Sequence, residues 1–232
     1  MLQKHIIKNI KEPKVLYLMW QDLSSNDRNR YHIGNLYEDR FEYLKENFPS
    51  KFDGFPAFSP ETEIHTGNVL SVFISRCPPK ERITYNNFLE AYGLDPEQAE
   101  VKNISDFALL GYTGAYLPSD EFHLFNPFKD IEPPFQFVMK IAGAHRHCRM
   151  LKDLGWQPDD DELKIVPEPE NKNDSQAISV TLQCTKLGYI PKGLTQSFHS
   201  WLDSKFKISL HLYRANGSEE HRFLYCFVNV SK

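Results

Sequence analysis

The sequence predicts two domains of different class: a small α+β domain over residues 1–134, then a mainly β domain, a small barrel with one helix, over residues 135–232. The division rests on the segment FNPFKDIEPPFQF, in which Pro127, Pro133 and Pro134 interrupt any helix or strand ladder. Strand-like runs and helical spacings are mixed before this segment, whereas strand-like runs predominate after it. With 41% hydrophobic residues in 232, each half can bury a core.

The first half begins with predicted strands. Three runs rich in aromatic and β-branched residues predict them: KVLYLMW at 14–20, RYHIGNLY at 30–37 and FEYL at 41–44. Residues 69–74 then carry apolar side chains at helical spacing, which predicts a helix. This half is therefore expected to combine a sheet with helices.

Two further helices are predicted from the residues at their ends. In TYNNFLEAYG, Thr84 is a candidate N-cap and Gly93 a C-terminal stop. The run SDFALLG repeats this pattern, with Ser105 as the cap and Gly111 as the stop.

The second half predicts strands almost throughout. A helix is predicted over 193–204, because the apolar residues of GLTQSFHSWLDS recur at helical spacing. The predicted strands are 137–143, 161–169, 176–182, 186–191, 206–214 and 221–230. The last two of them are expected to form a hairpin around ANGSEE.

The order of motifs over residues 14–125 resembles the N-terminal subdomain of HipA-type kinases. The matching residues are mostly packing and turn residues: Phe73, Pro78, Pro79, Gly93, Leu94, Asp106, Leu109, Leu110, Gly114 and Ala115. Nothing after them resembles a kinase core. No glycine-rich phosphate loop follows, and the remaining residues are too few to form a kinase core. The resemblance implies a protein-interaction unit and not kinase activity.

The second half resembles the HIRAN domain over residues 135–230. Three motifs carry the resemblance in order, a strand end, a loop with its strand, and a strand followed by a helix: Gly143; Glu168, Pro169, Asn171, Asp174, Ala177, Ile178 and Val180; Gly188, Tyr189, Ile190, Pro191 and Lys192. The resemblance implies an OB-like β-barrel with one helix.

The resemblance also implies a binding site. In DNA-binding members of the family the corresponding surface holds the 3′ end of single-stranded DNA. Asp174 matches the acid that accepts the terminal hydroxyl, Lys192 matches a base that faces phosphate, and Tyr189 matches a position on the same wall. The strand end GAHRH differs from the family pattern of an arginine followed by two tyrosines.

The departures from the family pattern concern four residues. His145, Arg146 and His147 stand where that arginine and the two stacking aromatics are expected, and Asn173 replaces an aromatic residue before the acid. These differences favour a basic nucleic-acid site without establishing specificity for a 3′ end. The residues predicted to bind nucleic acid are therefore His145, Arg146, His147, Asn173, Asp174, Tyr189 and Lys192.

Several of these residues also have a simpler interpretation. Asp174 can serve only to cap its loop, because Asx turns are common, and Lys192 can be an ordinary surface charge. His145 and His147 with Cys148 suggest a metal site, but no further ligand is near in sequence, and no metal is predicted.

Charge and composition exclude several function classes. The net charge of −4 divides into −6 before residue 135 and +2 after it, which argues against a protein that coats nucleic acid by charge alone. The four cysteines include no C-x-x-C pair, and no apolar run approaches the roughly 18 residues of a membrane helix. A cytoplasmic protein with free thiols is expected, with no membrane partner.

The function expected from the sequence is binding without catalysis. No nucleophile elbow, metalloprotease motif or phosphate loop is present, so no catalytic residue and no cofactor are predicted. The first hypothesis is a module that recognises single-stranded DNA or DNA ends, with the first domain as a protein-interaction unit. The alternative is a non-catalytic, antitoxin-like regulatory partner of a HipA-type kinase.

Overall fold

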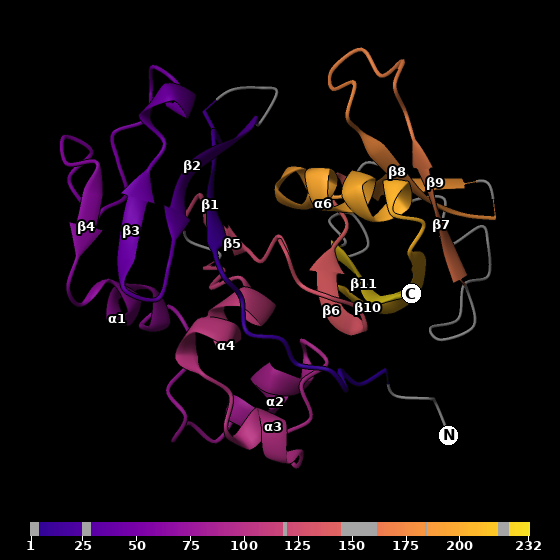
Figure 1. Ribbon diagram of the computed structural model, residues 1–232, viewed down its shortest axis with the longest axis horizontal. Helices are drawn as coiled ribbons and strands as arrows, with labels where there is room; N and C mark the ends of the chain where they lie inside the picture. Colours follow the sequence, from indigo (N-terminus) through magenta and orange to yellow (C-terminus); the bar gives the residue numbers. More distant parts are fainter. Residues whose placement is uncertain (1–4, 25–28, 118–119, 145–161, 184, 218–222) are drawn as a thin grey trace. The chain divides into compact units, whose positions relative to one another are not determined.

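A computed structural model describes residues 5–24, 29–117, 120–144, 162–183, 185–217 and 223–232 (Figure 1). The described chain forms two compact units. The N-terminal unit comprises residues 11–91 and 96–131. The C-terminal unit comprises residues 5–10, 92–95 and 132–232.

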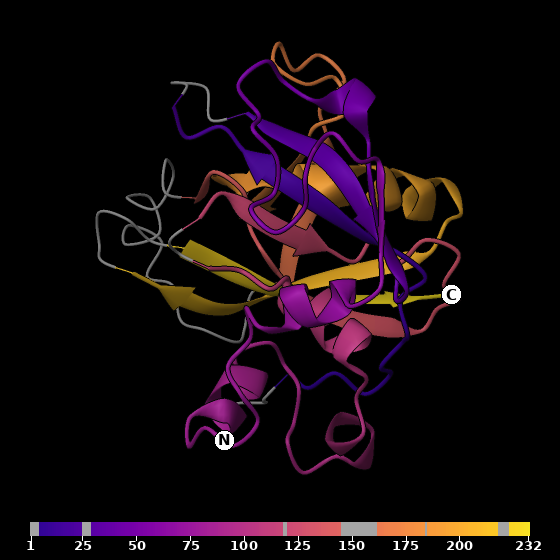
Figure 2. The same cartoon turned by 90° about the vertical axis from the view of Figure 1, so that its left-hand side faces the viewer.

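The N-terminal unit contains one antiparallel sheet in the order β4-β3-β2-β1-β5 (Figure 2). Its strands are β1 (Leu16–Gln21), β2 (Arg30–Leu36), β3 (Arg40–Tyr43), β4 (Ile64–Thr66) and β5 (Phe122–Phe125). The first three confirm the strands predicted from sequence. The short strands β4 and β5 were not predicted.

Short helices accompany this sheet. They are η1 (Lys45–Asn47), α1 (Val69–Ile74), α2 (Tyr85–Glu90), α3 (Ala99–Lys102) and α4 (Asp106–Thr113). In the core, Leu16 and Leu18 of β1 belong to one buried cluster with Phe73 of α1 and Leu110 of α4. The helices α1 and α4 therefore share a hydrophobic core with the sheet, as expected for an α+β unit.

The predicted helix ends are correct in part. Ser105 caps α4 as predicted, since its Oγ accepts a hydrogen bond from the Ala108 amide at 2.9 Å, whereas Thr84 makes no side-chain cap bond. The prediction that Gly111 ends the helix is wrong. The helix continues to Gly114, whose φ of +73° allows the left-handed turn that ends it.

Gly111 instead permits close packing between α4 and Pro13. A Cβ at this position would lie 2.9 Å from Cγ of Pro13. Sequence alone does not distinguish a glycine required by close packing from one required by a helix end.

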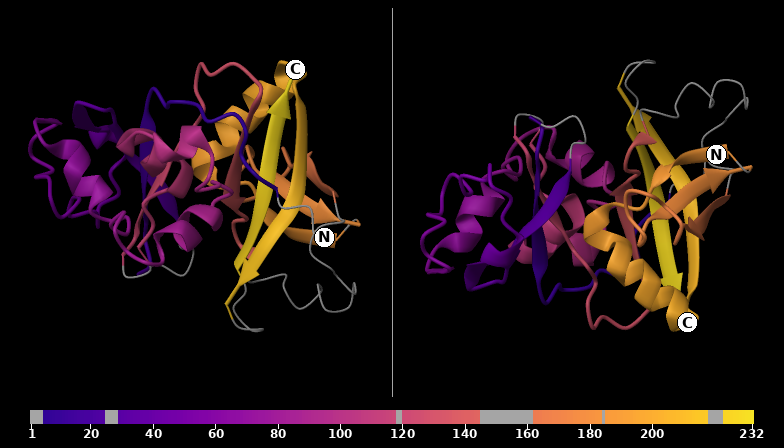
Figure 3. Two further views of the ribbon diagram at one scale, coloured as in Figure 1. Left: turned by 90° about the horizontal axis from the view of Figure 1, so that it is seen from below. Right: turned by 90° about the horizontal axis from the view of Figure 1, so that it is seen from above.

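The C-terminal unit contains six antiparallel strands in the order β6-β11-β10-β7-β8-β9 (Figure 3). They are β6 (Phe135–Lys140), β7 (Glu162–Pro167), β8 (Ile178–Leu182), β9 (Thr185–Tyr189), β10 (Lys207–Asn216) and β11 (Phe223–Ser231). An isolated bridge between Ala142 and Tyr189 joins the chain after β6 to the end of β9, so the first and last strands of the order are linked. The fold class is α+β and mainly β, as predicted.

The helix α6 (Lys192–Asp203) packs its apolar side against the core of this unit. Trp201 is only 5% exposed, and its ring lies 5.3 Å from that of Phe135 and 5.0 Å from that of Phe198. Leu194 is buried on the same helix. The prediction of one helix in this half is confirmed for the part of the chain that the structure describes.

Residues from the start of the chain complete the C-terminal unit. Ile7 is fully buried, and its amide donates to the carbonyl of Gly93 at 2.8 Å. The amides of Lys8 and Asn9 both donate to Oε1 of Gln136 in β6, at 3.1 Å each. Two short segments that precede residue 132 therefore belong by contact to this unit. No described helix combines the length and the apolar character needed to cross a membrane.

Candidate nucleic-acid interface

Three backbone segments of the C-terminal unit meet after the end of β6. The amide of Ala142 donates to the carbonyl of Tyr189 at 2.8 Å, and the amide of Tyr189 donates back to Ala142 at 2.9 Å. The Ile141 amide donates to the carbonyl of Leu224 at 2.8 Å. The chain after β6 thus lies between the end of β9 and the start of β11, and two of the three motifs found in the sequence are adjacent.

The third motif is a loop of residues 168–177 between β7 and β8, here called the recognition loop. The amide of Glu168 donates to the carbonyl of Ala177 at 2.8 Å and closes the loop at its base. The Asn171 amide donates to the Glu168 carbonyl at 2.9 Å, and the Ala177 amide to the Asp174 carbonyl at 2.9 Å. Two consecutive turns therefore fix the backbone of this polar segment.

Asn171 connects the recognition loop to β9. Its Oδ1 accepts the backbone amides of Asn173 at 3.0 Å and Asp174 at 3.3 Å. Its Nδ2 donates to Oε2 of Glu168 at 2.9 Å and to the hydroxyl of Tyr189 at 3.4 Å. Because Oδ1 faces two amide donors, the orientation of the side-chain amide is determined by its neighbours.

Asp174 combines the two roles considered for it. Its Oδ1 accepts the amide of Gln176 at 2.9 Å, which is the bond of an Asx turn. Within the described ranges, Oδ2 has no hydrogen-bond partner, and the residue is half-buried. The loop therefore holds the carboxylate in place by one oxygen and leaves the other able to accept a hydrogen bond.

A pair of opposite charges lies beside Tyr189. Nζ of Lys186 is 2.5 Å from Oε1 of Glu168 and 3.1 Å from the hydroxyl of Tyr189. The hydrogen bond from Lys186 lowers the pKa of Glu168 to about 2, and the same bond raises the pKa of Lys186. Both groups are therefore charged at neutral pH.

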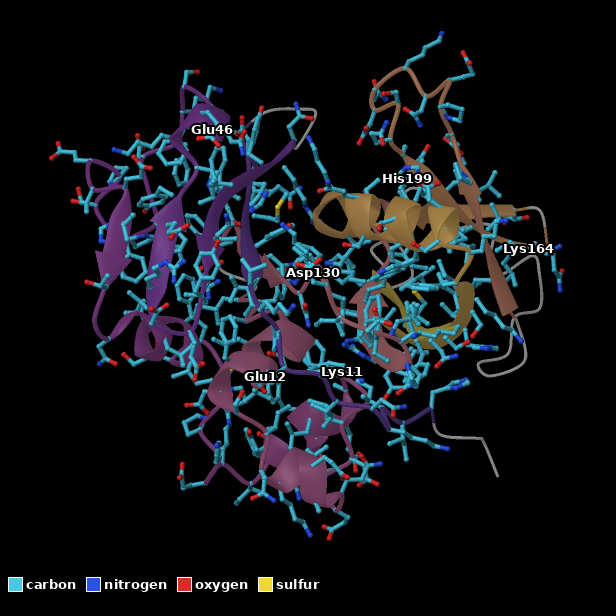
Figure 4. The ribbon with its side chains drawn as sticks, viewed as in Figure 1. Lys11, Glu12, Glu46, Asp130, Lys164 and His199 are labelled. Atoms are coloured by element: carbon cyan, nitrogen blue, oxygen red, sulfur yellow. The ribbon has the colours of Figure 1, made fainter. Side chains whose placement is uncertain are left out.

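The helix α6 contributes to the same region. Nε2 of His199 lies 2.9 Å from the carbonyl oxygen of Gln176, so a hydrogen bond joins the helix to the recognition loop (Figure 4). Lys192 is the first residue of α6, follows Tyr189 by three residues, and is exposed. Within the described part of the chain, Lys192 makes no ion pair, so its charge is available at the surface.

Some residues of this region did not stand out in the sequence. Lys186 was not predicted to belong to the site, because its pairing with Glu168 depends on the register of β7, β8 and β9. Phe223, at the start of β11, is 39% exposed, and Nζ of Lys140 lies 3.7 Å from the centre of its ring. An aromatic residue that follows a polar hairpin turn is the only signal that the sequence offered for it.

The structure brings together part of the predicted set. Asn173, Asp174 and Tyr189 are connected through Asn171, and Lys192 is near Tyr189 in the chain. The predicted residues His145, Arg146 and His147 lie outside the described residues, as does Cys148 of the alternative metal site. The described residues contain no group of three histidine, cysteine or acidic side chains suited to a metal ion.

Comparison with known proteins supports the resemblance for one half of the chain. No curated protein and no solved structure matches the sequence. The resemblance of residues 14–125 to the HipA-type N-terminal subdomain has no support from these comparisons and stays a hypothesis. Residues 135–230 match the family model of the HIRAN domain, which confirms the resemblance of the C-terminal half to that family.

Proposed function

We propose that the C-terminal unit binds single-stranded DNA, or the end of a DNA strand, without catalysing a reaction. The binding surface comprises Asn173, Asp174, Tyr189 and Lys192, here called the end-binding surface, together with the sequence-predicted His145, Arg146 and His147. The HIRAN family is a family of DNA-binding modules, so its match supports nucleic-acid binding in general. The preference for a single strand and for an end is the more specific part of the proposal.

The observation that carries the proposal is the arrangement around Asn171. Its amide group holds an acid, Asp174, and an aromatic residue, Tyr189, in one hydrogen-bonded network. Stacking of a base on an aromatic ring contributes about 1–3 kcal/mol and is indifferent to sequence. A carboxylate near phosphates is unfavourable unless it accepts a hydrogen bond, and a strand end supplies a hydroxyl for that bond.

The distribution of charge supports placing the binding site in this unit. Residues 1–134 carry 14 Lys and Arg against 20 Asp and Glu, whereas residues 135–232 carry 13 against 11. An acidic surface repels phosphate and is better suited to a protein partner. The N-terminal unit is therefore proposed as the protein-interaction part of the chain.

Replacement of Asp174 tests this proposal. We expect Asp174→Ala in the full chain to weaken binding of a labelled single strand with a free 3′ hydroxyl, and to affect a strand with a blocked end less. Asp203→Ala, which removes an exposed carboxylate at the end of α6, is the matched control and should leave both affinities unchanged. Equal effects of Asp174→Ala on free and blocked strands would show that the acid does not recognise an end.

A further inference from the structure

We infer that Lys186 and Asn171 make Tyr189 a hydrogen-bond donor toward the bound strand, and that Lys186 is a positioning residue and not a phosphate contact. This inference rests on the proposed function and specifies how the end-binding surface recognises its ligand. The hydroxyl of Tyr189 then donates a hydrogen bond to an acceptor atom of the strand, which is a phosphate oxygen or a base oxygen.

The chemistry of the two neighbours of the Tyr189 hydroxyl leads to this conclusion. The ammonium of Lys186, at 3.1 Å, has three N–H donors and no acceptor. The Asn171 group that faces the hydroxyl is Nδ2, also a donor, at 3.4 Å. The phenolic oxygen therefore accepts from both, and its own hydrogen is left to donate elsewhere.

The oxygen and nitrogen of the Asn171 side-chain amide cannot exchange places. Its Oδ1 already accepts the amides of Asn173 and Asp174, and rotation of the side-chain amide would place an NH₂ group against those two donors. Glu168 gives a second reason, because its Oε2 accepts from Nδ2 at 2.9 Å. The recognition loop itself thus determines which atom Tyr189 meets.

Glu168 fixes Lys186 in the same way. Its Oε1 lies 2.5 Å from Nζ, and the two side chains are 23% and 34% exposed. The pair connects the two neighbours of β8 in the sheet, since Glu168 follows β7 and Lys186 lies in β9. With one N–H toward Glu168 and another toward Tyr189, the positive charge of Lys186 is balanced within the protein and is held away from a phosphate.

The position of the charge relative to the ring agrees with this assignment. Nζ of Lys186 lies 4.8 Å from the centre of the Tyr189 ring, farther than it lies from the hydroxyl. It therefore approaches the ring from the hydroxyl end, and the hydrogen bond governs its place.

The salt dependence of binding separates a positioning lysine from a phosphate contact. Polarisation titrations of the full chain with a labelled short single strand would be made at several salt concentrations. The variants are Tyr189→Phe, Lys186→Met, the double variant, and Lys186→Gln, which keeps an N–H donor but loses the charge. Lys164→Met is the matched control, because Lys164 is an exposed lysine in β7 (Figure 4).

We expect Tyr189→Phe and Lys186→Met each to weaken binding by about five- to tenfold, the effect of one lost hydrogen bond. The double variant should be no weaker than either single variant, because Tyr189→Phe removes the O–H donor and Lys186→Met removes the group that directs the same donor. The slope of log affinity against log salt should not change, and Lys186→Gln should bind more tightly than Lys186→Met. Thermal unfolding identifies any variant that fails to fold.

Lys186→Gln and Tyr189→Phe keep the inference testable if Lys186→Met does not fold. A slope that falls by about 0.7 in Lys186→Gln, as for one lost phosphate contact on a single strand, would overturn the inference. Additive losses in a double variant of Tyr189→Phe with either Lys186 substitution would also overturn it. If the unmodified chain binds no single strand, the proposed function itself fails, which is a different outcome from a changed slope.

Discussion

At the scale of single residues, one side-chain amide connects the two halves of the candidate surface. Asn171 holds the turn that carries Asp174 and also contacts Tyr189. The sequence indicated Asn171 and Asp174 because short polar side chains in a loop hold turns through nearby amides. It did not indicate Lys186, since a cross-strand ion pair depends on strand register, which a single residue does not reveal.

The pair of Glu168 and Lys186 predicts a pH dependence of stability. The pKa of Glu168 falls from 4.5 to about 2 in the folded protein, so its stabilising effect is complete above pH 4.5 and is lost as the pH falls toward 2. Glu168→Gln should therefore lower the melting temperature at pH 7, and the difference from the unmodified protein should shrink between pH 4.5 and pH 2. A difference that is constant over this range would contradict the ion pair. Glu170→Gln, in the same loop but exposed, is the matched control.

At the scale of elements, the backbone at the ends of β6 and β9 determines where the residues of the candidate site lie. The long strands were predicted from runs rich in aromatic and β-branched residues, and α6 from the helical spacing of its apolar residues. Ser105 was recognised as a cap by its position before an apolar run. The bridge between Ala142 and Tyr189 was not predicted, because it joins residues far apart in sequence outside any regular pattern. Its existence depends on the backbone at Gly188.

Gly188 permits this close approach of two segments. Its φ is +151°, and a Cβ there would lie 2.4 Å from the carbonyl oxygen of Ala142. Gly188→Ala should destabilise the protein by about 1–3 kcal/mol from backbone strain alone, with a further loss from the contact. We also expect reduced strand binding, because the bridge places Tyr189. Urea unfolding would measure the first effect and polarisation the second.

Gly143→Ala is the matched control for this prediction. Gly143 also has a positive φ, +70°, but among the described residues a Cβ there would meet nothing within 4 Å. The substitution Gly143→Ala should therefore lower the stability of the protein less than Gly188→Ala does. Equal losses in the two variants would show that the contact with Ala142 is unimportant.

At the scale of the whole molecule, the C-terminal unit includes residues that lie outside the family match. Residues 5–10 and 92–95 join it through Ile7, Gly93 and Gln136. The sequence indicated a boundary at Pro133 and Pro134 from local chain-breaking residues. Such residues carry no information on which distant segment a strand will contact, so the participation of Ile7 could not be predicted.

Separation of the chain at Pro134 tests the division of roles. Residues 135–232 alone should retain the nucleic-acid affinity of the full chain, and residues 1–134 should show none. The isolated C-terminal piece should unfold at a lower temperature than the same unit in the full chain, because it lacks the bonds from Lys8 and Asn9 to Gln136. Gln136→Leu in the full chain checks the contribution of those bonds. A C-terminal piece that folds cooperatively but binds no strand would place the site elsewhere.

The most direct test of nucleic-acid binding at the end-binding surface is a polarisation titration of the full chain. The probes are one labelled single strand with a free 3′ end, the same strand with a blocked 3′ end, and a blunt duplex of equal length. We predict tightest binding to the free strand, weaker binding to the blocked strand and weakest binding to the duplex. Binding to neither single strand, or to both no more tightly than to the duplex, would contradict this prediction.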